Sequence, residues 1–215
     1  MEKIILMIDT GRDASVRAAK SLEERGCRVI LVQKEKREVP GVEAEIVHLM
    51  DMDAVNALVN RFECLDVLVL GAPPCPDDGP VGTGHDLSAM LEELVYFGRG
   101  TANLIEACIP KMEQGLKRIA CLTEPEGAHS LGRESGNLLR HQMLAALGTV
   151  GKQLFNKYRP EGFTFRWFCE GDAPGPMSAG EYILSQLSYH PDEAYIHSEE
   201  NRLVIRDGWL REIPW

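Results

Sequence analysis

Residues 4–32, IILMIDTGRDASVRAAKSLEERGCRVILV, decide the fold of this chain. The stretch opens on one apolar run and closes on another, and such runs indicate strands buried on both faces of a sheet. Between them, residues 14–25 predict a helix that Gly26 can end in a left-handed conformation. The apolar residues at helical spacing are Val16, Ala19 and Leu22. Strand, tight turn, helix and parallel strand form the βαβ unit that opens nucleotide-binding folds, with the ligand over the N-terminus of the first helix.

The rest of the chain continues this alternation. Strands are predicted at 45–47, 66–70, 118–123, 163–168 and 202–206, and helices at 51–62, 87–109, 138–158 and 178–187. Asp51 or Asp53 is expected to cap the helix at 51–62, and Pro110 to end or kink the helix at 87–109. The alternation predicts an α/β fold: a single doubly wound (Rossmann-like) parallel sheet flanked by helices on both faces. We expect one domain over residues 1–215, because no repeat or linker interrupts the chain.

Composition and net charge argue against several classes of function. The net charge of −10 argues against non-specific binding to nucleic acid or to an anionic membrane, because both need a basic surface. No apolar stretch approaches the roughly 20 residues that span a bilayer, and the first strand begins almost at Met1, so we expect no leader. The six cysteines are scattered without a C-x-x-C pair, which is typical of reduced thiols rather than a disulfide framework or zinc site. We therefore expect a cytoplasmic protein without a metal site.

Four short segments match the motifs of one protein family in their order along the chain. They are 66–69 with Ala72 (a strand and its Asn-Asn-Ala-Gly loop), Gly100 with Pro110-x-Met112 (an Asn-x-x-Gly helix ending in Pro-x-Met), 145–147 running ungapped to Pro160-x-Gly162 (the helix of a Tyr-x-x-x-Lys motif), and 195–209 (a C-terminal strand and an Asp-Gly-Gly signature). In these features the chain resembles the short-chain dehydrogenase/reductase family. The resemblance implies a Rossmann-like fold and NAD(P)-dependent oxidoreduction.

The resemblance also indicates which catalytic residues are replaced. In that family a tyrosine exchanges a proton with the substrate, a lysine lowers the tyrosine pKa and holds the nicotinamide ribose, and a serine polarises the substrate. The match places Arg140 at the tyrosine position and Leu144 at the lysine position, and the serine position falls on Thr123 or Glu124. The family's helix asparagine falls on Phe97. None of the five tyrosines has a lysine four residues later, so the Tyr-x-x-x-Lys pair is missing from the chain.

The phosphate-binding loop is altered as well. Of the family's Thr-Gly-x-x-x-Gly-x-Gly, the chain keeps Thr10-Gly11, which Arg12 follows. The missing glycines would let the backbone approach the pyrophosphate. Asp13 is expected to be a helix N-cap, and in the alternative it would be a repulsive neighbour of a phosphate.

The adenosine side of the predicted site has basic residues where NAD enzymes place an acid. Lys34, Lys36 and Arg37 follow the second strand and can pair with the 2′-phosphate of NADP, although a solvated basic turn has the same composition. His48 stands where the family has an aspartate near the adenine, and Ala72 keeps one position of the family's loop. We therefore expect no cofactor or weakly bound NAD(P), with NADP favoured over NAD. The candidate cofactor-binding residues are Thr10, Gly11, Arg12, Lys34 and Ala72.

The replaced positions offer weak candidates for different chemistry. Glu124, Arg140 and His141, with His129, cluster in sequence around the cleft of the family. A Glu–His pair can serve as acid and base, and an arginine can bind a carboxylate or phosphate. Scattered surface polarity is the simpler interpretation. The family's substrate lid looks deleted after residue 171, because few residues separate that position from the next helix.

Three functions follow from this pattern. The first is a catalytically deficient short-chain dehydrogenase/reductase that acts as a structural or regulatory subunit, paired with itself or with an active paralogue. Helices 87–109 and 138–158, which carry an apolar surplus, would form the oligomer. The second is an active NAD(P)-dependent oxidoreductase with atypical residues, and the third is an NADP-binding sensor without turnover. Neither nucleic acid nor a membrane is an expected partner.

Overall fold

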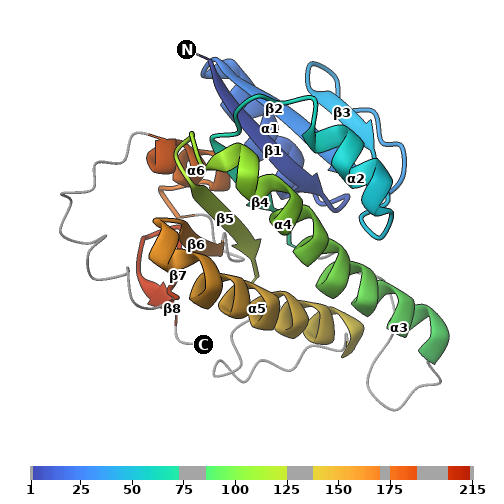
Figure 1. Ribbon diagram of the computed structural model, residues 1–215. Coiled ribbons are helices and arrows are strands. Elements are labelled where there is room, and N and C mark those ends of the chain that lie inside the picture. Colours follow the sequence, from blue (N-terminus) through green and yellow to red (C-terminus); the bar gives the residue numbers. More distant parts are fainter. Residues whose placement is uncertain (1, 73–85, 125–137, 170–174, 188–202, 214–215) are drawn as a thin grey trace.

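The computed structural model describes residues 2–72, 86–124, 138–169, 175–187 and 203–213. They form an eight-stranded sheet in the order β3-β2-β1-β4-β5-β6-β7-β8 (Figure 1). Strands from β3 to β7 pair in parallel, and β8 pairs antiparallel with β7. The strands are β1 (Lys3–Asp9), β2 (Cys27–Gln33), β3 (Glu43–Ile46), β4 (Val67–Leu70), β5 (Arg118–Thr123), β6 (Thr164–Cys169), β7 (Ile205–Asp207) and β8 (Glu212–Ile213). The predicted Rossmann-like parallel sheet is confirmed.

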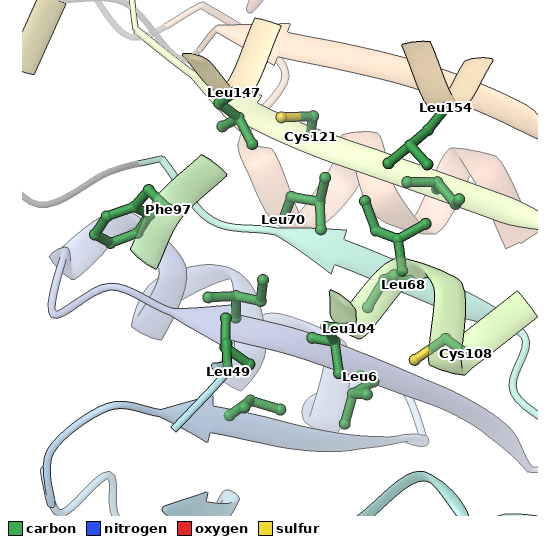
Figure 2. Packing of buried hydrophobic residues seen from close by; sticks show 14 of the residues in the cluster. Leu6, Leu49, Leu68, Leu70, Phe97, Leu104, Cys108, Cys121, Leu147 and Leu154 are labelled. Carbon is green, nitrogen blue, oxygen red and sulfur yellow. The ribbon is translucent and has the colours of Figure 1, made fainter. Parts of the chain in front are cut away.

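Helices cover both faces of this sheet (Figure 1). On one face, α1 (Asp13–Glu24) and α6 (Ala179–Leu187) contact each other and bury Leu22 and Ile183. The other face carries α2 (Met52–Val59), α3 (Leu87–Val95), α4 (Thr101–Met112) and α5 (Leu138–Tyr158), which a short 3-10 turn (Arg159–Glu161) follows. Figure 2 shows the larger core on this second face, where Leu6, Leu68 and Leu70 of the sheet lie close to Leu104 and Cys108 of α4. None of the described helices is long and apolar enough to cross a bilayer.

The centre of the sheet is a topological switch point. β1 lies between β2 and β4. The chain first runs from β1 through β2 to β3 on one side, and then crosses back to β4 and continues through β5 on the other side. Ligands of open α/β sheets bind in the crevice at such a point, beyond the carboxyl ends of the strands. Gly71 follows β4 there, and an added Cβ would lie 2.3 Å from the carbonyl oxygen of Ile8. The backbones after β1 and β4 therefore approach closely, and the Thr10 hydroxyl donates to the Ala72 carbonyl across the gap.

The helix predicted at 87–109 contains a short π-helical segment, η1 (Tyr96–Gly100), between α3 and α4. A π turn widens the helix locally and occurs often at functional sites. Of the two alternatives predicted for Pro110, an end to the helix is wrong, because α4 continues to Met112 with Pro110 in its last turn, and a kink there stays a prediction. Pro110 and the residue four positions earlier, Glu106, are both exposed, so water can reach the carbonyl that the proline leaves without an N–H donor.

The structure confirms some other local predictions and corrects the rest. Of the apolar residues predicted for α1, Ala19 and Leu22 are buried and the half-buried Val16 packs against the same core, so this prediction is confirmed, with Ser15 and Ala18 buried beside them. Asp51 caps α2 by accepting from the N–H groups of Asp53 and Ala54, and the helix ends at Val59 rather than near residue 62. The last parallel strand begins at Ile205, and β8 was not predicted. The predicted left-handed Gly26 is confirmed by a φ of 79°.

Candidate functional site

Two cavities open at the carboxyl end of the sheet, one on each side of the β1–α1 turn. The α1 cavity, of about 470 Å³, is lined by residues 11–15 and 17, by residues 122–124 at the end of β5, and by Ala72, Arg140, Phe168 and Ala179. The β2 cavity, of about 480 Å³, is lined by residues 8–11 and 33–37 and by Glu93, Tyr96, Phe97 and Met143. Both volumes are in the range of small-molecule sites.

An ion triad crosses the α1 cavity. Glu124, directly after β5, pairs through Oε1 with Arg12 and through Oε2 with Arg140. The side chains are largely shielded, with exposed fractions of 31% for Arg12, 13% for Glu124 and 16% for Arg140. The triad therefore ties the turn before α1 to the end of β5 and to the first turn of α5.

The triad residues are poorly suited to exchange a proton with a substrate. Arginine stays protonated in proteins, so Arg140 cannot exchange a proton with a substrate as a tyrosine can. Each oxygen of Glu124 faces a guanidinium, an arrangement in which the carboxylate is held as an ion rather than presented as a base. Thr123 is buried beside it. The described groups of this cavity are therefore better suited to bind a charged group than to transfer a proton.

A buried polar network closes the inner end of the β2 cavity. Asp9 and Gln33 are the last residues of β1 and β2 and lie opposite each other in the parallel register. Asp9 Oδ1 accepts from the N–H of Gly11 at 2.9 Å, and Oδ2 accepts from Gln33 Nε2 at 2.8 Å. Gln33 Oε1 accepts in turn from the N–H of Arg37 at 3.1 Å. The glycine N–H next to the phosphate position therefore already has an acceptor within the chain.

The basic residues predicted for a 2′-phosphate are also paired. Lys34 forms an ion pair with Glu93 of α3 and lies over the ring of Tyr96, with Nζ 4.8 Å from the ring centroid. Arg37 pairs with Asp13 at 2.9 Å. Burial is the main cause of the raised pKa of the Tyr96 phenol, so Tyr96 serves here as a neutral aromatic surface. The predicted contacts to NADP would have to replace these pairs.

The fold brings most of the predicted site residues together. Gly11, Arg12, Ala72, Glu124 and Arg140 all line the α1 cavity. Thr10, Gly11 and Lys34 line the β2 cavity.

Some predicted residues lie elsewhere. His141 is half-buried on α5 and lines neither of these two cavities among the described residues. Leu144, which the resemblance places at the lysine position, is buried. The expectation that Asp13 caps α1 is wrong: Arg12 holds the N-cap position, and no side-chain capping bond forms there within the described part of the chain. Residue 129 and residues 73–80 and 170–174 lie outside the described residues.

Sequence reasoning missed four residues of the site: Asp9, Gln33, Glu93 and Tyr96. The first two carried a usable signal, because each is the polar residue that ends an otherwise apolar parallel strand. Such residues meet at one edge of a parallel sheet, where ligands bind. Glu93 and Tyr96 gave no comparable signal, because their position depends on how α3 and η1 rotate over the sheet.

Searches against protein-family models and against the sequences of curated proteins found no match. Solved structures do match. A carbonyl reductase from Pseudomonas aeruginosa in complex with NADP superposes with a TM-score of 0.77 at 16% identity, covering 100% of both chains. The carbonyl reductase Sniffer of D. melanogaster gives 0.77 at 14% identity, also over 100% of both chains. The chain has the short-chain dehydrogenase/reductase fold. An aldohexose dehydrogenase from Thermoplasma acidophilum gives 0.71 at 12% identity, covering 97% of this chain and 94% of that one.

The predicted resemblance to short-chain dehydrogenases/reductases is thus confirmed for the fold. In that fold the crevice at the β1–β4 switch point takes the dinucleotide, and here it holds the α1 and β2 cavities. The chemistry of this chain has to be inferred from its own residues, because the identities are 16% or lower in these comparisons.

Proposed function

We propose that this protein is a divergent short-chain dehydrogenase/reductase without nicotinamide-dependent turnover. It acts as a structural or regulatory subunit of an oligomer in the cytoplasm, with a second copy or an active paralogue as its partner. The observation that carries the proposal is that groups placed to hold a dinucleotide are engaged within the chain. The N–H of Gly11 is bound to Asp9, Arg12 to Glu124, and Lys34 to Glu93.

Charge supports the same proposal. A pyrophosphate in the crevice would lie among the carboxylates of Asp9, Asp13 and Glu124, which belong to the β1–α1 turn and the end of β5. Replacement of the tyrosine and lysine positions by Arg140 and Leu144 removes the proton-transfer pair of the family as well.

The apolar surface supports an oligomer. Leu91 and Val95 of α3 are 61% and 42% exposed, and Met50 beside them is 38% exposed. Large apolar side chains grouped on one surface indicate a contact with another protein. By contrast, the exposed residues of α5 are polar, among them Lys152 and Gln153, so the contact through 87–109 and 138–158 would be centred on α3.

A second candidate is an NADP-binding sensor, and a third is an active oxidoreductase with atypical residues. The observation that favours the second is that a carbonyl reductase of the same fold is solved in complex with NADP. In this chain, binding would require Glu93 to release Lys34 to the 2′-phosphate. An oxidoreductase would need a proton donor other than the residue at the tyrosine position.

Two measurements separate these functions. The proposal expects no NADPH-dependent absorbance change with a panel of carbonyl compounds, and no thermal shift with NAD(P)(H). A sensor instead expects a shift without turnover, because a ligand at 100 times its Kd adds about 2.7 kcal/mol of stability. Turnover with any substrate would overturn the proposal.

The oligomer is tested by light scattering coupled to size-exclusion chromatography. Leu91→Glu is expected to dissociate it. The matched control is Leu210→Glu, which makes the same change at another exposed leucine, on the β7–β8 turn. A monomeric wild type that also captures no dehydrogenase from its native source would contradict the subunit role.

A further inference from the structure

A groove of about 410 Å³, which we call the α3 groove, lies between α3 and residues 48–50. Leu91 and Val95 of α3 line it, and so does Met50 from the other segment. All three side chains are exposed, by 61%, 42% and 38% in that order. Leu91 and Val95 are one helical turn apart and therefore share a face of α3. A helical apolar stripe with a flexible methionine beside it is a surface suited to the apolar face of another helix.

Residues 48–50, which form one side of the α3 groove, are fixed to the helix that follows α3. The carbonyl oxygen of Leu49 accepts from the buried Nδ2 of Asn103 at 3.1 Å. Gly100 allows a close contact at the same point, because an added Cβ would lie 2.8 Å from the Cβ of Leu49. Met50 is therefore held beside α3 before a partner binds, and a preformed surface lowers the entropy cost of binding.

The two segments that form the α3 groove are acidic. Residues 48–53 and 86–95 contain five carboxylates and neither lysine nor arginine. The carboxylates are Asp51, Asp53, Asp86, Glu92 and Glu93, of which Glu93 is half-buried and the others are exposed. The nearest cations are Lys34, which lines the groove and is paired with Glu93, and Arg99, one turn after Val95. Five carboxylates against two cations leave a negative surplus around an apolar centre.

This charge distinguishes between possible partners. A second copy of the chain would bring the same carboxylates to the contact, and its net charge is also −10. Like charges that face each other across an interface oppose association, whereas a basic partner would be attracted. The charge therefore favours a different chain over a second copy.

We propose that the α3 groove docks a basic amphipathic helix of a different protein chain. The apolar side chains of that helix contact Met50, Leu91 and Val95, and its lysines or arginines face the surrounding carboxylates. The apolar centre supplies most of the affinity, and the charged rim selects the partner and speeds the encounter. The inference rests on the proposed subunit role, because it names the chemistry of the partner.

The probe for the test is a synthetic helical peptide of about 18 residues, with leucine on one face and lysine on the other. Its labelled form is titrated with the full chain and followed by fluorescence anisotropy. A matched peptide with glutamate in place of lysine is expected to bind at least about tenfold more weakly. Glu92→Gln should weaken binding of the lysine peptide about two- to threefold, as expected for one exposed charge pair, and should reduce its salt dependence. Glu113→Gln, which removes an exposed carboxylate at the end of α4, is the matched control and should bind as wild type does.

Leu91→Glu separates docking from a general attraction between a basic peptide and an acidic protein. Loss of the apolar contact should weaken binding at least about tenfold, whereas general attraction would be strengthened by the added carboxylate. Leu210→Glu adds the same charge at an exposed leucine of the β7–β8 turn and should not weaken binding. If Leu91→Glu fails to fold by circular dichroism, Val95→Glu on the same face decides.

Three outcomes would overturn the inference: no binding of the lysine peptide, equal binding of the two peptides, or unweakened binding by Leu91→Glu. A wild-type homodimer that Leu91→Glu dissociates would overturn it as well, because a second copy would then occupy the groove, yet the proposed subunit role would stand. NADPH-dependent turnover by the same preparation would overturn the proposed function.

Discussion

Replacing Gly151 with alanine tests how closely α5 lies on the sheet. An added Cβ would lie 2.3 Å from Cζ2 and 3.1 Å from Cη2 of Trp167 on β6. Trp167 is 2% exposed and sits in the closed core on this face, so its ring has no space to move aside. The methyl group can be accommodated only if α5 shifts away from β6, and this helix also carries Arg140 in its first turn.

The two energetic effects of this substitution oppose each other. Alanine in place of glycine in a helix interior contributes about 1 kcal/mol of stability. Overpacking of a closed core costs about 1–3 kcal/mol and occasionally more. Because the contact with Trp167 is far shorter than an ordinary contact of roughly 3.5–4 Å, we expect the clash to prevail. The expected net loss is about 2 kcal/mol, or a Tm lower by about 4–8 °C for a chain of this length.

Thermal and urea unfolding measure this loss, and Gly98→Ala is the matched control. An added Cβ on Gly98 would lie 4.0 Å from the Cβ of Ala146, which is an ordinary contact. Gly98→Ala should therefore be neutral or stabilising by up to about 1 kcal/mol. If Gly151→Ala raised the Tm as Gly98→Ala does, the packing of α5 on Trp167 described above would be refuted.

Three further predictions concern buried polar groups and thiols. Asp9→Ala removes the acceptor of the Gly11 N–H and of the Gln33 side-chain amide, so it should lower the free energy of unfolding in urea by about 2–3 kcal/mol. The isosteric Asp9→Asn keeps one acceptor oxygen and should lower it by less. Burial raises the pKa of Asp207, but its hydrogen bonds with Arg211 and with backbone N–H groups outweigh burial and hold the pKa below its usual value. Because folding lowers this pKa, ionised Asp207 stabilises the fold at pH values above the unfolded pKa of about 3.9. This contribution is lost as the pH falls through the folded pKa, so the stability difference between wild type and Asp207→Asn should shrink below about pH 4. Burial raises the pKa of the Cys121 thiol, so half-buried Cys64 should be alkylated well before Cys121 in a mass-spectrometric time course, and the reverse order would contradict the packing of β5.

The sequence predicted the sheet well because its strands are continuous apolar runs. β5 and α5 have the predicted bounds, 118–123 and 138–158. The η1 segment was not predicted, because a π turn adds one residue to the helix without a break in the apolar pattern that marks the core. The two-residue β8 was missed because it is too short to show a period.

The site was predictable to a smaller extent. Arg12, Glu124 and Arg140 were each singled out, yet their convergence on one carboxylate depends on the approach of α5 to the end of β5. The pairing of Lys34 with Glu93 depends in the same way on how α3 lies over the sheet. Spacing along the chain names candidate charges but does not determine which of them meet across the sheet.

Polar residues at the strand ends bind other groups of the chain at the edge of the crevice. Buried N–H and amide groups need acceptors, whether from a ligand, from water or from the chain. In this chain Asp9 accepts hydrogen bonds from Gly11 and Gln33, and Glu124 forms ion pairs with two arginines, so these groups have partners within the chain. The two carboxylates differ in what holds them: Asp9 is 6% exposed within a backbone turn, whereas Glu124 is held by side chains beside an open cavity. The crevice edge is thus held at Asp9 by a backbone turn and a strand-end amide, and at Glu124 by side chains from two other elements.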